Sequence, residues 1–105
     1  MSFSLTIRTA RDLAEEAQVA LQARIAAAID ARVEGQAREL GYNSAAHLAG
    51  YAASTVPDWA AEARAFIAWR DQVWQVVFAL HDRHSAAQTL PTVEDVTGAL
   101  PAWKG

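Results

Sequence analysis

The first part of the chain has apolar residues at every third or fourth position, which predicts a long amphipathic helix over about residues 10–40. Thr9 is the expected N-cap, and Asp12 stands three residues later, in the position that closes a capping box. Gly41 is expected to end the helix, because glycine readily adopts the left-handed conformation found after helix C-termini. The apolar stripe consists of Leu13, Ala17, Leu21, Ile25, Ile29, Val33 and Leu40.

Residues 1–8 show a different pattern, in which polar and apolar side chains alternate. A period of two is typical of an extended strand. One isolated strand cannot form a stable sheet. Residues 1–8 are therefore expected to form an extended arm, and a second chain is the expected partner if this arm pairs at all.

A second long helix is expected in the middle of the chain. It should start at Pro57 or Asp58, because proline suits the first turn of a helix, and continue to about Ser85. Its apolar residues cover more than one side, which indicates a helix that is central to a bundle or shared with another subunit. The main stripe is Trp59, Ala63, Phe66, Arg70, Val73, Val77 and Leu80, with Ile67, Trp74, Phe78 and His81 beside it.

Two short helices complete the pattern. One should cover residues 45–53, with Asn43 or Ser44 as its N-cap. The other should follow Thr92 as N-cap, with Asp95 closing a variant of the capping box.

Together these elements predict an all-α protein with a single domain over residues 1–105. The expected architecture is a small helical bundle in which two long helices pack antiparallel and the first short helix bridges them. Trp103, near the C-terminus, is expected to fold back onto this bundle. The chain has no internal repeat and no low-complexity segment that would indicate a second domain.

Composition narrows the classes of function. Hydrophobic residues make up 52% of the chain and charged residues 20%, a mixture typical of a packed globule. The formal net charge is -3, and the basic excess typical of nucleic-acid binding is missing. No run approaches the roughly 20 apolar residues of a membrane span, and the first residues lack the pattern of a signal peptide. The chain has no cysteine, which fits a cytosolic protein.

Two histidines, His81 and His84, lie on one face of the second long helix. A zinc site normally needs at least three protein ligands, and the third would have to be His47 or a carboxylate. Ser85 lies close to both histidines, but a catalytic triad also needs an oxyanion hole, which one helix end does not supply. We therefore expect no enzyme activity and no cofactor, with His81 and His84 as weak candidates for a metal or small ligand.

The four tryptophans are many for a chain of 105 residues. Trp59 and Trp74 follow the apolar stripe and are expected in the core. Trp69 is expected to point away from the main stripe, beside Arg70. It is equally compatible with the core and with a binding hot spot, where tryptophan and arginine are enriched.

Glu62 and Arg70 are charged residues within an otherwise apolar helix. Glu62 is expected to pair with Arg64 or Arg70, or Arg70 with Asp71 of a partner chain, and such pairs next to tryptophan are usually structural. The candidate partner-binding residues are therefore Trp69, Arg70 and Glu62.

An ordered series of short segments extends over most of the chain, from about Ala23 to Trp103. The segments are residues 24–30, 41–44 (Gly-Tyr-Asn-Ser), 51–52, 61–74, 91–94 (Pro-Thr-Val-Glu) and 100–101. This series resembles the C-terminal segment of small proteins encoded in the tail modules of tailed phages and prophages, often beside tail-fibre genes. Its most specific part is the Ala-Glu…Phe…Trp-Arg…Trp pattern within residues 61–74.

The resemblance implies a tail-associated or tail-assembly role, with other tail or tail-fibre proteins as partners. It also implies a cytoplasmic location in a bacterial host, with association with the virion as a further option. Both a structural adaptor and an assembly chaperone fit this role. A homodimer is expected because the second long helix is apolar on more than one side. The alternative function is a small-ligand or metal-binding module that uses His47, His81 and His84.

Overall fold

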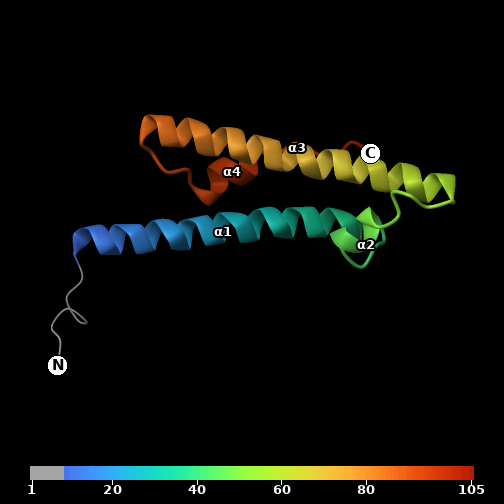
Figure 1. The fold of residues 1–105 in the computed structure, drawn as a ribbon, viewed down its shortest axis with the longest axis horizontal. Coiled ribbons are helices and arrows are strands. Elements are labelled where there is room, and N and C mark those ends of the chain that lie inside the picture. Colours follow the sequence, from blue (N-terminus) through green and yellow to red (C-terminus); the bar gives the residue numbers. More distant parts are fainter. Residues whose placement is uncertain (1–8) are drawn as a thin grey trace, which may run out of the picture.

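A computed structural model describes residues 9–105, and this part of the chain contains four helices and no strand. The helices are α1 (Ala10–Glu39), α2 (Ala45–Ala49), α3 (Pro57–Ala87) and α4 (Val93–Ala99). The two long helices lie side by side and run in opposite directions (Figure 1). The all-α bundle predicted from the sequence is confirmed, whereas the expected arm at residues 1–8 lies outside the described residues.

The two short helices hold the long pair together at different places. The bridging role predicted for α2 is confirmed, because α2 contacts both α1 and α3 near the turn that joins the long helices. The second short helix, α4, also contacts both long helices and lies between them closer to their other ends (Figure 1). The chain after α4 then runs back along α3.

The predicted ends of α1 are confirmed by their hydrogen bonds. The hydroxyl of Thr9 accepts a bond from the backbone N–H of Asp12 at 3.1 Å, and the Asp12 carboxylate accepts one from the N–H of Thr9. At the other end Gly41 has a φ of 98°, and the N–H of Tyr42 donates to the carbonyl of Ala37 at 3.0 Å. These bonds form a Schellman motif, which satisfies carbonyl groups that the helix leaves free.

The short helix α2 ends earlier than the sequence pattern predicted. Ser44 rather than Asn43 caps it, by accepting a bond from the N–H of His47. The helix ends at Ala49, because the next residues form turns with bonds between positions i and i−3, such as the one from the N–H of Tyr51. The first N–H of α2 donates to the carboxylate of Glu34 at 3.0 Å, which ties α2 to α1.

The core lies in the part of the bundle where α1, α2, α3 and α4 meet. Phe66 of α3 is completely buried in it, and so are two alanines, Ala37 of α1 and Ala63 of α3. The indole ring of Trp103 packs on this core, as predicted. The buried apolar residues of this cluster are Ile29, Val33, Ala37, Ala45, Leu48, Ala63, Phe66, Trp69, Val73 and Val96.

The N-terminal part of α1 lies outside this core. Residues 9–20 are all exposed, although the apolar stripe predicted from the sequence continues through them. Leu13 keeps 51% of its surface exposed and Val19 keeps 65%. Only from Leu21 onwards does the stripe begin to be covered by α3 and α4.

The N-terminal cap of α4 is expected to make the stability of the fold depend on pH. The pKa of Asp95 is lowered from its ordinary value of 3.8, mainly because its carboxylate accepts a hydrogen bond from the N–H of Thr92. A carboxylate whose folded-state pKa lies below the unfolded value stabilises the fold above the unfolded pKa, and this contribution is lost as pH falls through the folded pKa. We expect Asp95→Asn to be less stable than the unchanged protein at about pH 6, and the difference to be smaller at about pH 3, because the Asp95 carboxylate begins to be protonated below its ordinary pKa of 3.8.

Urea unfolding of both proteins at the two pH values measures this difference. Glu94→Gln is the matched control, because Glu94 lies in the same first turn but its carboxylate makes no capping bond. A difference between Asp95→Asn and the unchanged protein that stayed constant with pH would contradict the assignment of the capping carboxylate.

Candidate functional site

The structure places Trp69 in the core, which corrects the expectation that it points away from the main stripe. Only 5% of its surface is exposed. Its indole Nε1–H donates to the carbonyl of Pro101 at 2.9 Å, and its ring packs edge-on against Trp103 with the centroids 5.8 Å apart. The guanidinium of Arg32 lies 4.9 Å from the centre of the same ring. Trp69 therefore joins α1, α3 and the C-terminal segment and presents almost no surface to a partner.

The two charged candidates also differ from the expected pairing. Arg70 pairs with Asp71 of the same chain at 3.1 Å and not with Glu62. Glu62 pairs with neither Arg64 nor Arg70. Its carboxylate instead accepts a hydrogen bond of 2.8 Å from the hydroxyl of Tyr42, at the end of α1. The structure thus separates Glu62 from Trp69 and Arg70 and brings it to another surface.

That surface is a cleft at the α2 end of the bundle, which we call the aromatic cleft. It has a volume of about 350 Å³. It forms where the end of α1, the helix α2 with its following turn, and the first turns of α3 meet. Its lining residues are Leu40, Gly41, Tyr42, Asn43, His47, Tyr51, Trp59 and Glu62.

Trp59 is the most exposed large side chain of this cleft. The sequence placed it in the core, but 50% of its surface is exposed. The reason is its position in the first turn of α3, which extends past the end of α1 (Figure 1). The ring of Trp59 packs edge-on against Tyr51, with the ring centres 5.5 Å apart and the planes at 72°.

The remaining rings of the aromatic cleft form a connected series. Tyr51 lies 5.7 Å from Tyr42 and 5.4 Å from His47, measured between ring centres. The pKa of Tyr42 is raised, mainly because its hydroxyl donates to Glu62, with burial and the negative charge of Glu62 as further causes. The rings are thus held by one another and by a charged hydrogen bond, which makes the cleft a preformed surface.

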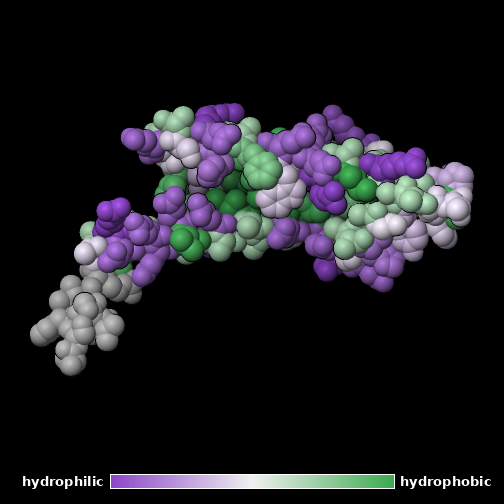
Figure 2. Space-filling view, viewed as in Figure 1, coloured by the Kyte–Doolittle hydropathy of each residue, from purple (hydrophilic) through white to green (hydrophobic). Residues whose placement is uncertain are grey.

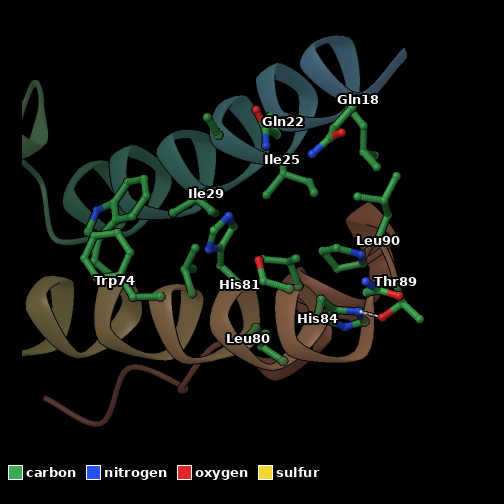
Figure 3. A pocket seen from close by; sticks show the side chains of 18 residues that line it. Gln18, Gln22, Ile25, Ile29, Trp74, Leu80, His81, His84, Thr89 and Leu90 are labelled. Carbon is green, nitrogen blue, oxygen red and sulfur yellow. Dashed lines mark hydrogen bonds between the residues drawn. The ribbon is translucent and has the colours of Figure 1, made fainter. Parts of the chain in front are cut away.

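A second hollow lies between α1, α3 and α4, and we call it the apolar groove. Its volume is about 600 Å³, and Figure 2 shows it as a mainly hydrophobic depression between the two long helices. Its walls include Ile25 and Ile29 of α1, Trp74 of α3, and Leu90 before α4 (Figure 3). Further apolar residues of its lining are Leu21, Val77, Phe78, Leu80, Pro91 and Val96.

Both histidines that the sequence singled out line the apolar groove. His84 Nδ1 lies 2.7 Å from the hydroxyl of Thr89, which fixes its ring beside the end of α3 (Figure 3). His81 projects into the groove opposite Ile29, and its Nδ1 lies 3.7 Å from the carboxylate of Asp82. His47 lies in the aromatic cleft at the other end and cannot act as their third ligand.

Residues 9–105 contain no group of three or more side chains arranged to hold a metal ion. Over the same residues no helix has the length and apolar character needed to cross a membrane. Every buried polar side-chain atom in this part of the chain has a hydrogen-bond partner.

Comparison of the chain with models of protein families, with curated proteins and with solved structures finds no match. The resemblance to phage tail-module proteins therefore stays a hypothesis based on the segments of the sequence that carry it.

Sequence reasoning missed the aromatic cleft because its residues come from three separate elements. Tyr42, Tyr51 and Trp59 are not periodic with one another, so no helical pattern brings them together. The one available signal was that the segments 41–44 and 51–52 lie outside the main stripe but belong to the ordered series on which the hypothesis of a tail-module resemblance rests.

Proposed function

We propose that this protein is a non-enzymatic protein–protein interaction module, of the tail-associated or tail-assembly kind that its sequence resembles, and that the aromatic cleft is its working surface. The observation that supports this proposal most directly is the half-exposed Trp59, held against Tyr51 in a preformed cleft. Exposed tryptophan and tyrosine in a concave surface are typical of binding hot spots, because large rigid rings bury much area at a small cost in entropy.

The proposal predicts that Trp59→Ala abolishes binding while the fold is retained. Truncating a hot-spot tryptophan costs about 2–4 kcal/mol of binding free energy, which weakens binding about 30-fold or more. The measurement is a pull-down of purified tail and tail-fibre proteins, with circular dichroism as a check of the fold. Phe78→Ala is the comparison variant, because Phe78 is also an exposed aromatic residue of α3 but lines the apolar groove instead of the aromatic cleft.

Binding that survives Trp59→Ala, or that is lost equally in Phe78→Ala, would speak against the aromatic cleft as the working surface. In the second case the apolar groove would be the surface that the partner contacts.

We also propose that the apolar groove is covered by a second copy of this chain. Residues 9–20 of α1 are all exposed, and a helix end without tertiary contacts is marginal in water. In the apolar groove beside this end of α1, Phe78 and Leu90 are also more than half exposed. The α1 end cannot fill the groove of its own chain, because α1 forms one wall of it, whereas two copies related by a twofold axis can cover each other's groove and helix end.

The proposed dimer predicts a change in mass for a groove variant. We expect light scattering after size exclusion to give twice the chain mass of 11.3 kDa for the unchanged protein and the monomer mass for Phe78→Glu, because a buried unpaired carboxylate is costly. Val56→Glu is the control, since Val56 is an exposed apolar residue at the α2 end, and it should stay dimeric.

A monomeric unchanged protein would overturn the dimer. It would also leave the groove open for the alternative function, because about 600 Å³ lies within the range of roughly 300–1,000 Å³ found for small-ligand sites. His81 and His84 would then be the polar groups that orient a bound ligand.

A further inference from the structure

The aromatic cleft contains a negative charge without a positive partner among the described residues. Glu62 is partly buried, and its carboxylate accepts a hydrogen bond from the neutral hydroxyl of Tyr42. The two nearest arginines in the sequence of α3 are engaged elsewhere. Arg64 donates to the carbonyl of Ala52 at 3.2 Å, and Arg70 pairs with Asp71. The charge of Glu62 is therefore free to interact with a group that enters the cleft.

Two further features make the cleft attractive to positive charge. The rings of Tyr42, Tyr51 and Trp59 line it, and the face of an aromatic ring attracts a cation, tryptophan most strongly. Leu40 and Gly41 at the C-terminal end of α1 also line it, and this end of a helix carries a partial negative charge. The carboxylate, the rings and the helix end therefore all favour the same sign of ligand charge.

From this arrangement we infer that the aromatic cleft binds a cationic side chain, a guanidinium or an ammonium group, of the partner protein. This inference rests on the proposed function and names the chemistry that the cleft recognises. The charged group lies beside Glu62, and its aliphatic stem packs along Trp59 and Tyr51. A neutral apolar side chain is disfavoured there, because it would remove water from Glu62 without replacing the lost interactions.

Three small amides test the chemistry of the cleft directly. N-acetyl-arginine amide and N-acetyl-lysine amide carry the two cations, and N-acetyl-norleucine amide is the neutral probe of similar length. The readout is the NMR signal of the Trp59 indole N–H during titration, assigned by its disappearance in Trp59→Phe. We expect saturable shifts with the two cationic amides and none with norleucine amide. Equal binding of the norleucine amide would overturn the inference.

Glu62→Gln provides the matched variant. Glutamine keeps an oxygen that can accept the hydrogen bond from Tyr42, so the fold is retained while the charge is removed. We expect the cationic amides to bind this variant about tenfold more weakly, in line with the loss of one charge-assisted hydrogen bond. Asp58→Asn is the control, since Asp58 is an exposed carboxylate in the first turn of α3 that does not line the cleft. Unchanged affinity of Glu62→Gln would overturn the role of the carboxylate.

Capture of a tail protein by the variants Trp59→Ala and Glu62→Gln distinguishes this inference from the proposed function. If Trp59→Ala and Glu62→Gln both abolish capture of a tail protein, both proposals are supported. If Trp59→Ala abolishes it and Glu62→Gln does not, the cleft binds a partner but not through a cation, and this inference fails alone. Capture that survives both substitutions, together with binding of the free amides, would make the ligand a small soluble cation and overturn the assignment to a partner side chain.

Discussion

Replacing Trp69 by alanine should destabilise the protein by about 3–5 kcal/mol, as is usual when a buried aromatic side chain is truncated. Only 5% of the surface of Trp69 is exposed, so the substitution leaves a cavity between α1, α3 and the C-terminal segment. It also removes the donor for the carbonyl of Pro101 and the ring that holds Trp103. The free energy of unfolding of a small domain is only about 5–15 kcal/mol, so a loss of this size strongly lowers the urea concentration at the unfolding midpoint.

The measurement is urea unfolding followed by circular dichroism. Trp59→Ala is the matched control, because it removes the same side chain from a half-exposed position and should cost about 1 kcal/mol. Trp69→Phe should fall between the two, since it retains a ring but leaves the carbonyl of Pro101 without its donor. Similar midpoints for Trp69→Ala and Trp59→Ala would contradict the placement of Trp69 in the core.

Replacing Leu48 by alanine should destabilise the protein by about 2–5 kcal/mol and weaken the aromatic cleft at the same time. Leu48 is completely buried and belongs to the five residues of α2, a length at which a helix has no stability of its own. Leu48 belongs to the buried cluster that includes residues of both long helices, so we expect its loss to loosen α2 and the following turn, which carry His47 and Tyr51. Partner binding should therefore fall together with stability.

Urea unfolding and the tail-protein pull-down measure the two effects on the same variant. Ala46→Gly is a suitable control, because Ala46 is an exposed residue of α2 and the change costs only the roughly 1 kcal/mol of a glycine in a helix. A Leu48→Ala protein with unchanged stability would show that α2 is held by other contacts. Unchanged partner binding despite lower stability would show that the cleft does not depend on α2.

The two proposed surfaces lie at opposite ends of the long helices, which has a consequence for assembly. A dimer formed through the apolar groove leaves the aromatic cleft of each copy exposed at the α2 end. Such a dimer presents two identical clefts and can bind two copies of a partner, or two sites on one oligomer. Two linked sites strengthen binding well beyond the affinity of either when the partner's geometry allows both to be occupied.

Much of the fold could be predicted from the sequence because it depends on local physical chemistry. Thr9 and Thr92 cap helices through bonds to residues three positions later, and Gly41 adopts a backbone conformation that other residues avoid. Helical periodicity likewise reveals α1 and α3 in any environment, because it depends only on residues within a few turns. These features establish an all-α chain with two long helices before any tertiary contact is considered.

The functional surfaces could not be predicted in this way, because burial and pairing depend on where each helix ends relative to its neighbours. Trp59 and Trp69 are both tryptophans of one helix. The stripe predicted a core position for Trp59, which is half exposed, and left Trp69 equally compatible with the core and with a surface. Trp69 is buried because the C-terminal segment returns to cover it, whereas Trp59 is exposed because the start of α3 extends beyond α1. The pairing of Glu62 with Tyr42 joins residues 20 positions apart, a contact that only the packing of both long helices against α2 creates.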